Sequence, residues 1–252
     1  MDGRGRNKRF GLLVPLALFA GALVPRMWAL DWGLPTAQHV DEPALLEVAM
    51  RMLRDGTLNP RRFVYPSLPY ELFAAAIRLS VWWSNLLGDP VTVRSLPVKN
   101  YHITTAPAIF IWSRGVTALL AAATVPLLWA LGRRMFDWRI GLLAALLLAI
   151  SQFHVRYSHY ITPDAPTGLW VVLALLGAWR VATRGDWRGY LLAGAGVGLS
   201  AGYKYNAGVV AVAVALANSA LIDRIRGGGS GDVAEVKTLG AELIVRSSSR
   251  AV

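Results

Sequence analysis

The sequence predicts an all-α membrane protein, a polytopic bundle of transmembrane helices. Hydrophobic residues make up 55% of the 252 residues and ten residues are Trp, and the mean hydropathy is +0.43. A soluble domain is usually less apolar. Apolar windows of about 20 residues, each long enough to cross a bilayer, recur along the chain. They lie at residues 10–30, 68–87, 110–131, 140–158, 166–182, 189–203 and 205–222.

The net charge of +11 does not indicate nucleic-acid binding. A nucleic-acid binder gathers Lys and Arg on one soluble face, whereas here they stand in short clusters between the apolar windows. The absence of cysteine excludes disulfide bridges and thiolate chemistry. No strong phosphate-loop, dinucleotide or zinc signature is present. The sequence therefore indicates no cofactor and no metal site, and it leaves a divalent-ion requirement open.

The first window, residues 10–30, follows the basic N-terminus MDGRGRNKR. This pattern is compatible with a signal peptide. However, the apolar run is longer than a typical signal core and lacks a clear small-x-small cleavage site, which favours an uncleaved first span. Basic residues stay on the cytoplasmic side of a membrane, so the N-terminus is predicted to be cytoplasmic. We expect Arg26, near the far end of this span, to extend to the membrane interface.

The window at 68–87 has two interpretations. It is long enough to span, but it carries Glu71 and Arg78 seven residues apart, on one helical face. If it lies in the outer interface as an amphipathic helix, the arginines of the later loops fall on the cytoplasmic side with the N-terminal charges; if it spans, they fall outside. Charge distribution favours the interfacial helix. Six spans follow, at 10–30, about 112–132, 139–157, 166–182, 189–203 and 205–222.

An external segment of about residues 31–111 separates the first two of these spans and contains HVDEP. An apolar repeat with helical spacing follows and predicts an amphipathic helix. Pro43 fits the start of this helix, and Asp41 and Glu42 just before it lie near the positive end of the helix dipole. The repeat consists of Leu45, Val48, Ala49, Met52 and Leu53.

The predicted topology places further charged residues on the external face. Asp164 in HYITPDAP and Lys204 in GYKYN join Asp41 and Glu42 there, together with Arg114 at the outer end of the second span. Charged groups at the bilayer boundary are costly unless they pair or line a cavity. We therefore expect these residues to share a polar pocket.

Two other patterns have structural interpretations. Gly194, Gly198 and Gly202 form a series of small residues along one helical face, which predicts helix packing. His154 and His159 are five residues apart, which is not the spacing of a helical metal pair.

Five motifs in order resemble the membrane glycosyltransferases of the GT-C class, specifically glycosyltransferase family 39, which includes protein O-mannosyltransferases and the aminoarabinose transferases that modify lipid A. The resemblance covers about residues 10–222, and it departs from the family pattern at Ser67, where a second Pro is common. The motifs are HVDE, YPSLPYELFAAAIRL, SRGVTALLAAATVPLLWALGRRMF, SQFHVRYSHYITPDAPTGLW and AGYKYNAG.

The resemblance implies a multi-pass enzyme of the plasma membrane. It implies transfer of a sugar from a polyprenyl-phosphate carrier to a lipid, glycan or protein acceptor on the extracytoplasmic face. The role that it implies for Asp41 is that of the general base, with Glu42 helping to bind substrate or to hold the loop.

The remaining site residues follow from the same chemistry, which needs positive charge near the phosphate. Arg114 and Lys204 are expected to contact the phosphate because both are cations at the outer face. Asp164 and Tyr65 are expected to complete the pocket.

Residues 1–222 are expected to form the N-terminal part of a GT-C-like core. Residues 223–252 are Gly-rich and polar, and we expect a flexible cytoplasmic tail there. Family members are usually longer, so the chain is expected to be truncated, frame-shifted or a fragment, and inactive alone if the missing part is essential. The alternative is a non-enzymatic polytopic protein, such as a transporter fragment or an assembly subunit. A transporter would place its polar groups nearer the bilayer midplane.

Overall fold

The computed structural model describes residues 3–96 and 106–226, with side chains from residue 13 onward. The predicted tail comprises residues 223–252, and its part at 227–252 lies outside the described residues. The described part of the chain consists of helices and the segments that join them. They are α1 (Gly3–Met27), α2 (Asp41–Asp55), α3 (Ser67–Leu86), α4 (Pro107–Met135), α5 (Trp138–Ile150), α6 (Gln152–Ser158), α7 (Asp164–Arg184), α8 (Trp187–Tyr203), the 3₁₀-helix η1 (Tyr205–Val210) and α9 (Ala211–Arg226).

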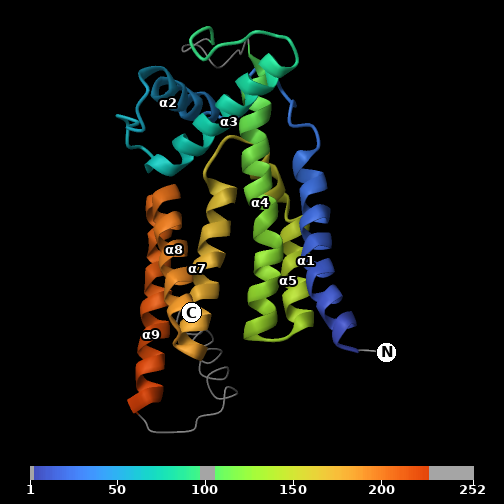
Figure 1. Ribbon diagram of the computed structural model, residues 1–252, viewed down its shortest axis with the longest axis vertical. Coiled ribbons are helices and arrows are strands. Elements are labelled where there is room, and N and C mark those ends of the chain that lie inside the picture. Colours follow the sequence, from blue (N-terminus) through green and yellow to red (C-terminus); the bar gives the residue numbers. More distant parts are fainter. Residues whose placement is uncertain (1–2, 97–105, 227–252) are drawn as a thin grey trace, which may run out of the picture.

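The long helices α1, α4, α5, α7, α8 and α9 stand side by side as a bundle, while α2 and α3 lie across one end of it (Figure 1). The predicted class, an all-α membrane bundle, is confirmed. Helix α3 packs against α2, α4 and α8. The window at 68–87 therefore lies over the end of the bundle, as the interfacial interpretation predicts, and not alongside the other helices.

Three described helices are long and apolar enough to cross a membrane: Pro107–Met135, Asp164–Arg184 and Tyr205–Arg226. The pair α5 and α6 would be a fourth if its two parts form one bent span. The described apolar part of α1, Leu13–Met27, is shorter, and α8 has 17 residues. Each predicted span thus coincides with helical structure, in two cases divided between two helices, and the number that cross the membrane stays a prediction.

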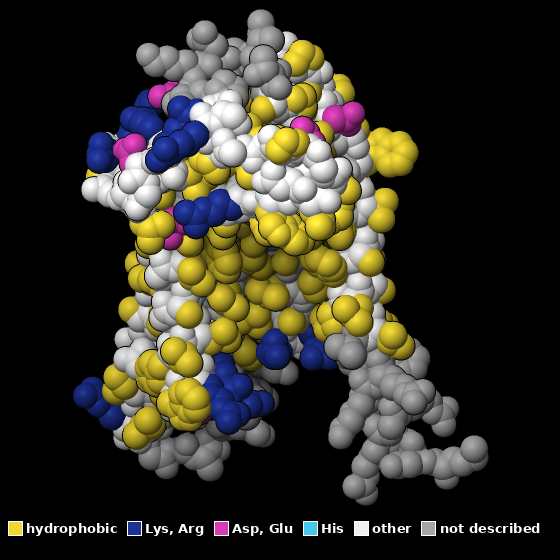
Figure 2. Space-filling view, turned by 45° about the horizontal axis from the view of Figure 1, so that its top comes forward, with side chains coloured by type: hydrophobic (Ala, Val, Ile, Leu, Met, Phe, Trp, Pro, Cys, Tyr) yellow, Lys and Arg dark blue, Asp and Glu magenta, His cyan; other side chains and the backbone are white. Residues whose placement is uncertain are grey.

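The two ends of the bundle differ in charge. The arginines of the later loops stand where α4, α7 and α9 end and where α5 and α8 begin, at the end that holds the N-terminus of α1 (Figure 1). We call this the basic end, and the end under α2 and α3 the covered end. A zone of hydrophobic side chains separates Lys and Arg side chains near the two ends (Figure 2). These basic-end residues are Arg133, Arg134, Arg139, Arg180, Arg184, Arg188, Arg224 and Arg226.

Exposed tryptophans mark both ends of this apolar zone. Trp28 follows α1, and Trp82 and Trp83 lie in the last part of α3, all near the covered end, with exposed fractions of 76%, 59% and 44%. Trp138 and Trp187 begin α5 and α8 at the basic end and are also exposed. Tryptophan is typical of the membrane–water interface on each side of a bilayer, so both ends have the character of an interface.

The predicted amphipathic helix of the external segment is confirmed as α2. Its apolar residues Leu45, Val48 and Ala49 are almost completely buried, because they pack against α3 in one hydrophobic core. The helix begins at Asp41, so the two acidic residues lie in its first turn and not before it. Gly56 ends the helix with a φ of 64°, and its N–H donates to the carbonyl of Met52, a left-handed termination that glycine adopts without strain.

The predicted span at 139–157 is not one helix. Helix α5 ends at Ile150, α6 begins at Gln152, and the two axes differ by 55°. Ser151 between them has an extended ψ of 115°, which interrupts the helical hydrogen bonds. A break inside an apolar span leaves backbone carbonyls that need other donors.

Arg26 supplies these donors. Its guanidinium donates to the carbonyl oxygens of Ala149 (3.1 Å), Leu148 (3.1 Å) and, within α1, Ala22 (2.7 Å). The side chain is fully buried. The expectation that Arg26 extends to the interface is therefore wrong, because the freed carbonyls at the end of α5 bind it inside the bundle.

The close packing of α7 on α8 uses small residues other than the predicted series. A Cβ on Gly194 or Gly198 would meet no described atom within 4 Å, whereas one on Gly196 would lie 2.3 Å from the backbone nitrogen of Ala174. A Cβ on Gly177 would lie 2.2 Å from that of Ala193. Small residues do permit close helix packing here, but on a neighbouring face of α8.

Candidate functional site

A buried ion pair joins α2 to α4 at the covered end. The Nε of Arg114 donates to Oε1 of Glu42 at 2.8 Å, and Nη2 donates to Oε2 at 3.0 Å. The side chains are 2% and 0% exposed. The two-point geometry is the strong form of an arginine–carboxylate contact, and mutual pairing is what makes two buried charges tolerable.

Glu42 also accepts hydrogen bonds from the backbone of two other segments. The N–H of Ile161 donates to Oε1 at 3.2 Å, and the N–H groups of Gln38 and His39 donate to Oε2 at 3.2 and 3.3 Å. One carboxylate therefore holds together the loop before α2, the first turn of α2, helix α4 and the segment between α6 and α7.

Arg114 is directed entirely toward protein groups. Its Nη1 donates to the carbonyl oxygens of Leu30 (2.7 Å) and Trp32 (2.9 Å), in the segment that follows α1. Helix α4 begins at Pro107, about two turns before Arg114. The arginine therefore lies near the covered end of α4, about two turns inside the helix and buried beneath the loops.

Asp41 is the accessible carboxylate next to this buried pair. Its side chain is 28% exposed, and the hydroxyl of Tyr65 donates to its Oδ2 at 3.1 Å. Nδ1 of His39 accepts from the backbone N–H of Asp41 at 3.2 Å. Among the described residues Oδ1 has no hydrogen-bond donor, so one oxygen of Asp41 is held and the other is open.

The environment of Tyr65 keeps its hydroxyl protonated. Partial burial, the charge and hydrogen bond of Asp41, and the charge of Asp164 together raise the pKa of Tyr65 to about 12. The phenol is therefore protonated at neutral pH and keeps donating to Asp41.

Lys204 and Asp164 form an ion pair across the top of α7 and α8. Asp164 is the first residue of α7, and Lys204 joins α8 to η1. The side chains are 31% exposed for Lys204 and 38% for Asp164. The hydroxyl of Tyr205, next to Lys204, donates to the carbonyl of Phe63 at 3.3 Å, which ties η1 to the loop that carries Tyr65.

All six residues proposed from the sequence thus lie at the covered end, in three pairs. These are Asp41–Tyr65, Glu42–Arg114 and Asp164–Lys204. Among the described residues, no group of three or more His, Asp or Glu is placed to hold a metal ion.

Sequence reasoning missed the aromatic surroundings of His39. The ring of His39 lies 5.2 Å from that of Tyr160 and 6.1 Å from that of Tyr157, between centroids. His39 stands inside the HVDE motif, and both tyrosines stand inside the RYSHY stretch of another motif. Their positions within motifs were the only signal for them, because nothing in their spacing predicts the contact.

Comparison with known proteins gives a family match in the later part of the chain. Residues 105–228 match the family described as dolichyl-phosphate-mannose-protein mannosyltransferase. No curated protein and no solved structure matches the chain. The matched segment contains Arg114, Asp164 and Lys204, while Asp41, Glu42 and Tyr65 precede it. Over residues 105–228 this chain is therefore similar to the dolichyl-phosphate-mannose-protein mannosyltransferases, and the match supports a membrane glycosyltransferase of the GT-C type.

Proposed function

We propose that the covered end is the active site of a sugar transferase, which moves a sugar from a polyprenyl-phosphate carrier to a hydroxyl of a lipid, glycan or protein. The observation that carries this proposal is the arrangement of Asp41. Its carboxylate is accessible, is held through one oxygen by Tyr65, and lies beside a fully buried Glu42–Arg114 pair. The covered end faces the extracytoplasmic side of the plasma membrane in this proposal.

Asp41 acts as the general base. Its open Oδ1 takes the proton of the acceptor hydroxyl while the acceptor oxygen bonds to the anomeric carbon of the sugar. The bond between that carbon and the phosphate oxygen breaks on the opposite face, so the anomeric configuration inverts and the lipid phosphate leaves with the electron pair. A base near the acceptor and a cation near the leaving phosphate are the two requirements of this step.

Lys204 is the cation that we assign to the leaving phosphate. It is partly exposed and its present partner is Asp164, so a phosphate competes with one carboxylate for the ammonium group. Arg114 is buried and its guanidinium binds Glu42 and two carbonyls. This burial favours a positioning role for Arg114 and Glu42, which hold the Asp41 turn, over direct contact with the phosphate.

Transfer from a labelled polyprenyl-phosphate sugar tests the base. The purified chain is reconstituted in vesicles and compared with Asp41→Asn, for which we expect a loss of about 10²- to 10⁴-fold. Asp55→Asn, at the other end of α2, is the matched control and should keep wild-type transfer. Equal transfer by wild type and Asp41→Asn rejects Asp41 as the base.

Binding of the carrier provides a readout that does not depend on turnover. Lys204→Gln should weaken binding of a polyprenyl phosphate about tenfold or more, because a charged hydrogen bond is lost. Asp41→Asn should bind it as wild type does. Wild-type affinity in Lys204→Gln would remove the lysine from the phosphate site.

Single cysteines test the orientation, since the chain has no native cysteine. Val64→Cys and Lys204→Cys at the covered end should react with a membrane-impermeant thiol reagent from outside intact cells. Arg188→Cys at the basic end should react only after the cells are opened. The reverse pattern would put the site on the cytoplasmic face.

A further inference from the structure

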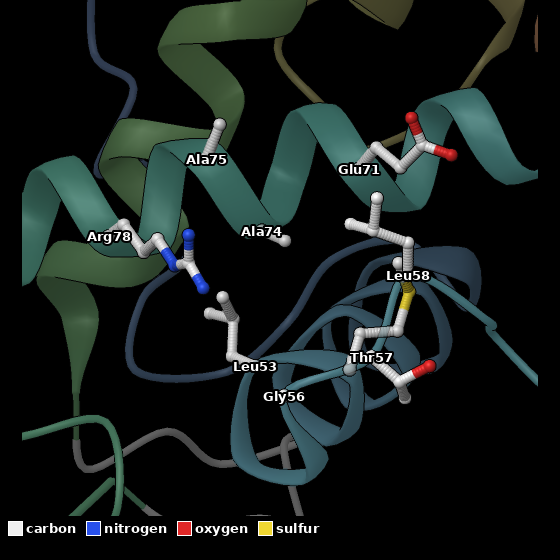
Figure 3. A pocket seen from close by; sticks show the side chains of 9 residues that line it. Leu53, Gly56, Thr57, Leu58, Glu71, Ala74, Ala75 and Arg78 are labelled. Atoms are coloured by element: carbon white, nitrogen blue, oxygen red, sulfur yellow. The ribbon is translucent and has the colours of Figure 1, made fainter.

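A second pocket lies between the last turn of α2 and the first half of α3, and the transfer mechanism does not use it (Figure 3). Its volume is about 300 Å³. Leu53, Leu58 and Ala75 contribute apolar walls. The pocket begins at Met52, eleven residues after Asp41, which is about 16 Å along the helix axis. None of the six candidate-site residues lines it.

Two opposite charges stand at this pocket. Glu71 and Arg78 both line it, and their spacing places them on one face of α3, about 10 Å apart along its axis. Figure 3 shows the two side chains at opposite ends of the pocket, with the Arg78 guanidinium directed toward Leu53.

Neither charge is neutralised by another described residue. Other charged side chains of this region have partners: Arg51 pairs with Glu47, and Arg61 pairs with Asp55. Glu71 and Arg78 form no hydrogen bond or ion pair with the residues that the structure describes. The pocket thus offers an acceptor and a donor of opposite charge, separated by an apolar surface.

The exposed residues of α3 near the pocket are typical of the lipid headgroup layer. Trp82 lies one turn after Arg78 on the same helical face and is 59% exposed. The exposed residues Leu79 and Leu86 accompany it. Interfacial tryptophan sits at headgroup level, and an arginine beside it keeps its charged end in the same layer.

We propose that this pocket binds the headgroup of a zwitterionic phospholipid with a primary amine, such as phosphatidylethanolamine. The guanidinium of Arg78 donates to the phosphate, and the carboxylate of Glu71 accepts from the ammonium group. The side chains of Glu71 and Arg78 are long enough to bend toward each other. A headgroup shorter than the roughly 10 Å between the two residues along the axis of α3 can therefore contact both. The glycerol carbons lie against Leu53 and Leu58. Charge-assisted contacts at both ends select a headgroup that carries both charges.

Native mass spectrometry of the purified chain in a non-ionic detergent tests the proposal. Dioleoyl phosphatidylethanolamine and dioleoyl phosphatidylglycerol are titrated separately, and we expect tighter binding of the former. Glu71→Gln should weaken phosphatidylethanolamine binding about tenfold and leave phosphatidylglycerol unchanged. Arg78→Gln should weaken the binding of both lipids, because both carry the phosphate.

Arg51→Gln is the matched control, since Arg51 lies on α2 outside the pocket and is paired with Glu47. It should bind both lipids as wild type does. Ala75→Trp fills the pocket from an exposed position without entering the α2–α3 core, and it should abolish the preference for phosphatidylethanolamine. Circular dichroism of each variant verifies that the helices are intact.

Three outcomes would overturn the proposal. The wild type binds the two lipids with equal affinity, Glu71→Gln binds phosphatidylethanolamine as tightly as Arg51→Gln does, or Ala75→Trp still prefers phosphatidylethanolamine. A fourth arm uses soluble glycerophosphoethanolamine. If it competes at the same concentration as the lipid, the ligand is a soluble phosphoethanolamine compound and not a membrane lipid. None of these measurements needs a sugar donor, so their failure leaves the proposed transfer reaction untouched.

Discussion

Among the side chains that the structure describes, Arg26 and Arg114 are the two fully buried arginines, and their charges are balanced in different ways. Arg114 faces a carboxylate, Glu42, and completes its bonds with two carbonyl oxygens. Arg26 has no carboxylate partner among the described residues. It donates to three carbonyl oxygens, and its Nη2 lies 2.9 Å from Nδ1 of His154.

The difference separates a residue of the proposed site, Arg114, from a residue that stabilises the helix bundle, Arg26. The Arg114–Glu42 pair is neutral as a unit, and it holds the turn that presents Asp41. Arg26 binds the carbonyls at the end of α5, where the helix dipole is negative, and so stabilises a broken helix. A buried cation in this fold can thus be balanced by a carboxylate or by peptide dipoles, and the two solutions should respond differently to mutation.

The largest effect is expected when the carboxylate is removed from the pair. Glu42→Gln keeps the shape of the side chain but leaves the Arg114 charge buried and uncompensated, and this should lower the free energy of unfolding by about 3 to 5 kcal/mol. Unfolding in mixed micelles of increasing dodecyl sulfate content measures it. The double variant with Arg114→Gln should be less destabilised than the sum of the single variants. A cost for Glu42→Gln below about 1 kcal/mol would contradict this account.

Removal of Arg26 should cost less, because no charge is left behind. Arg26→Met removes the three side-chain hydrogen bonds to carbonyl oxygens, and we expect a loss of about 1 to 3 kcal/mol in the same unfolding measurement. Arg134→Met is the matched control: Arg134 also donates to a carbonyl four residues before it, but it is exposed. If Arg26→Met costs as much as Glu42→Gln, the distinction between the two arginines fails.

Loss of the Tyr65–Asp41 hydrogen bond should have a smaller effect on the free energy of unfolding, and this effect should depend on pH. Tyr65→Phe removes the hydrogen bond to Asp41 and should cost about 1 kcal/mol at neutral pH. Because the pKa of Tyr65 is raised to about 12 from an ordinary value near 10, the protonated phenol is favoured in the folded state. This contribution to stability is complete below pH 10 and is lost as the pH rises through about 12.

Unfolding of wild type and Tyr65→Phe between pH 8 and 12.5 measures this difference. Tyr190→Phe is the control, since its hydroxyl also donates to a side chain, that of Asn218 at 2.7 Å, away from any carboxylate of the site. A stability difference between wild type and Tyr65→Phe that stays constant over this range would argue against the Tyr65–Asp41 contact.

The smallest effect is expected at an exposed arginine. Arg51 pairs with Glu47 one turn away on α2, at 3.6 Å and with both side chains about two-fifths exposed. Glu47→Gln should change the free energy of unfolding by less than about 0.5 kcal/mol, since solvent screens such pairs. A cost comparable to that of Arg26→Met would mean that burial is not what distinguishes the arginines.

Hydrophobic length predicted the helices well, because crossing a bilayer imposes a simple requirement on composition. The break at Ser151 was not predictable in the same way. The window 139–157 is apolar throughout its first part, and the residue that makes the break tolerable, Arg26, lies more than a hundred positions earlier. A local pattern does not reveal a donor supplied by a distant helix.

The candidate site, too, was only partly predictable from the sequence. Counting basic residues in the loops brought Asp41, Glu42, Arg114, Asp164 and Lys204 to one membrane face, and all lie at the covered end. The pairing of each cation with one acid depends on how deeply the side chains are buried, and this burial cannot be read from the sequence. The sequence treated Arg114 and Lys204 alike, whereas the structure buries the first under the loops and leaves the second partly exposed.

The bonds of Glu42 also have a consequence for biosynthesis. Its guanidinium partner is 72 residues later in the chain and its backbone donor at Ile161 is 119 residues later. A ribosome that has just released residue 42 has synthesised neither. The turn that carries Asp41 therefore cannot take its final hydrogen bonds, and the Glu42 carboxylate stays without these partners, until α4 and the segment after α6 have been synthesised. Asp41 reaches its final position late in translation, although it is encoded near the start.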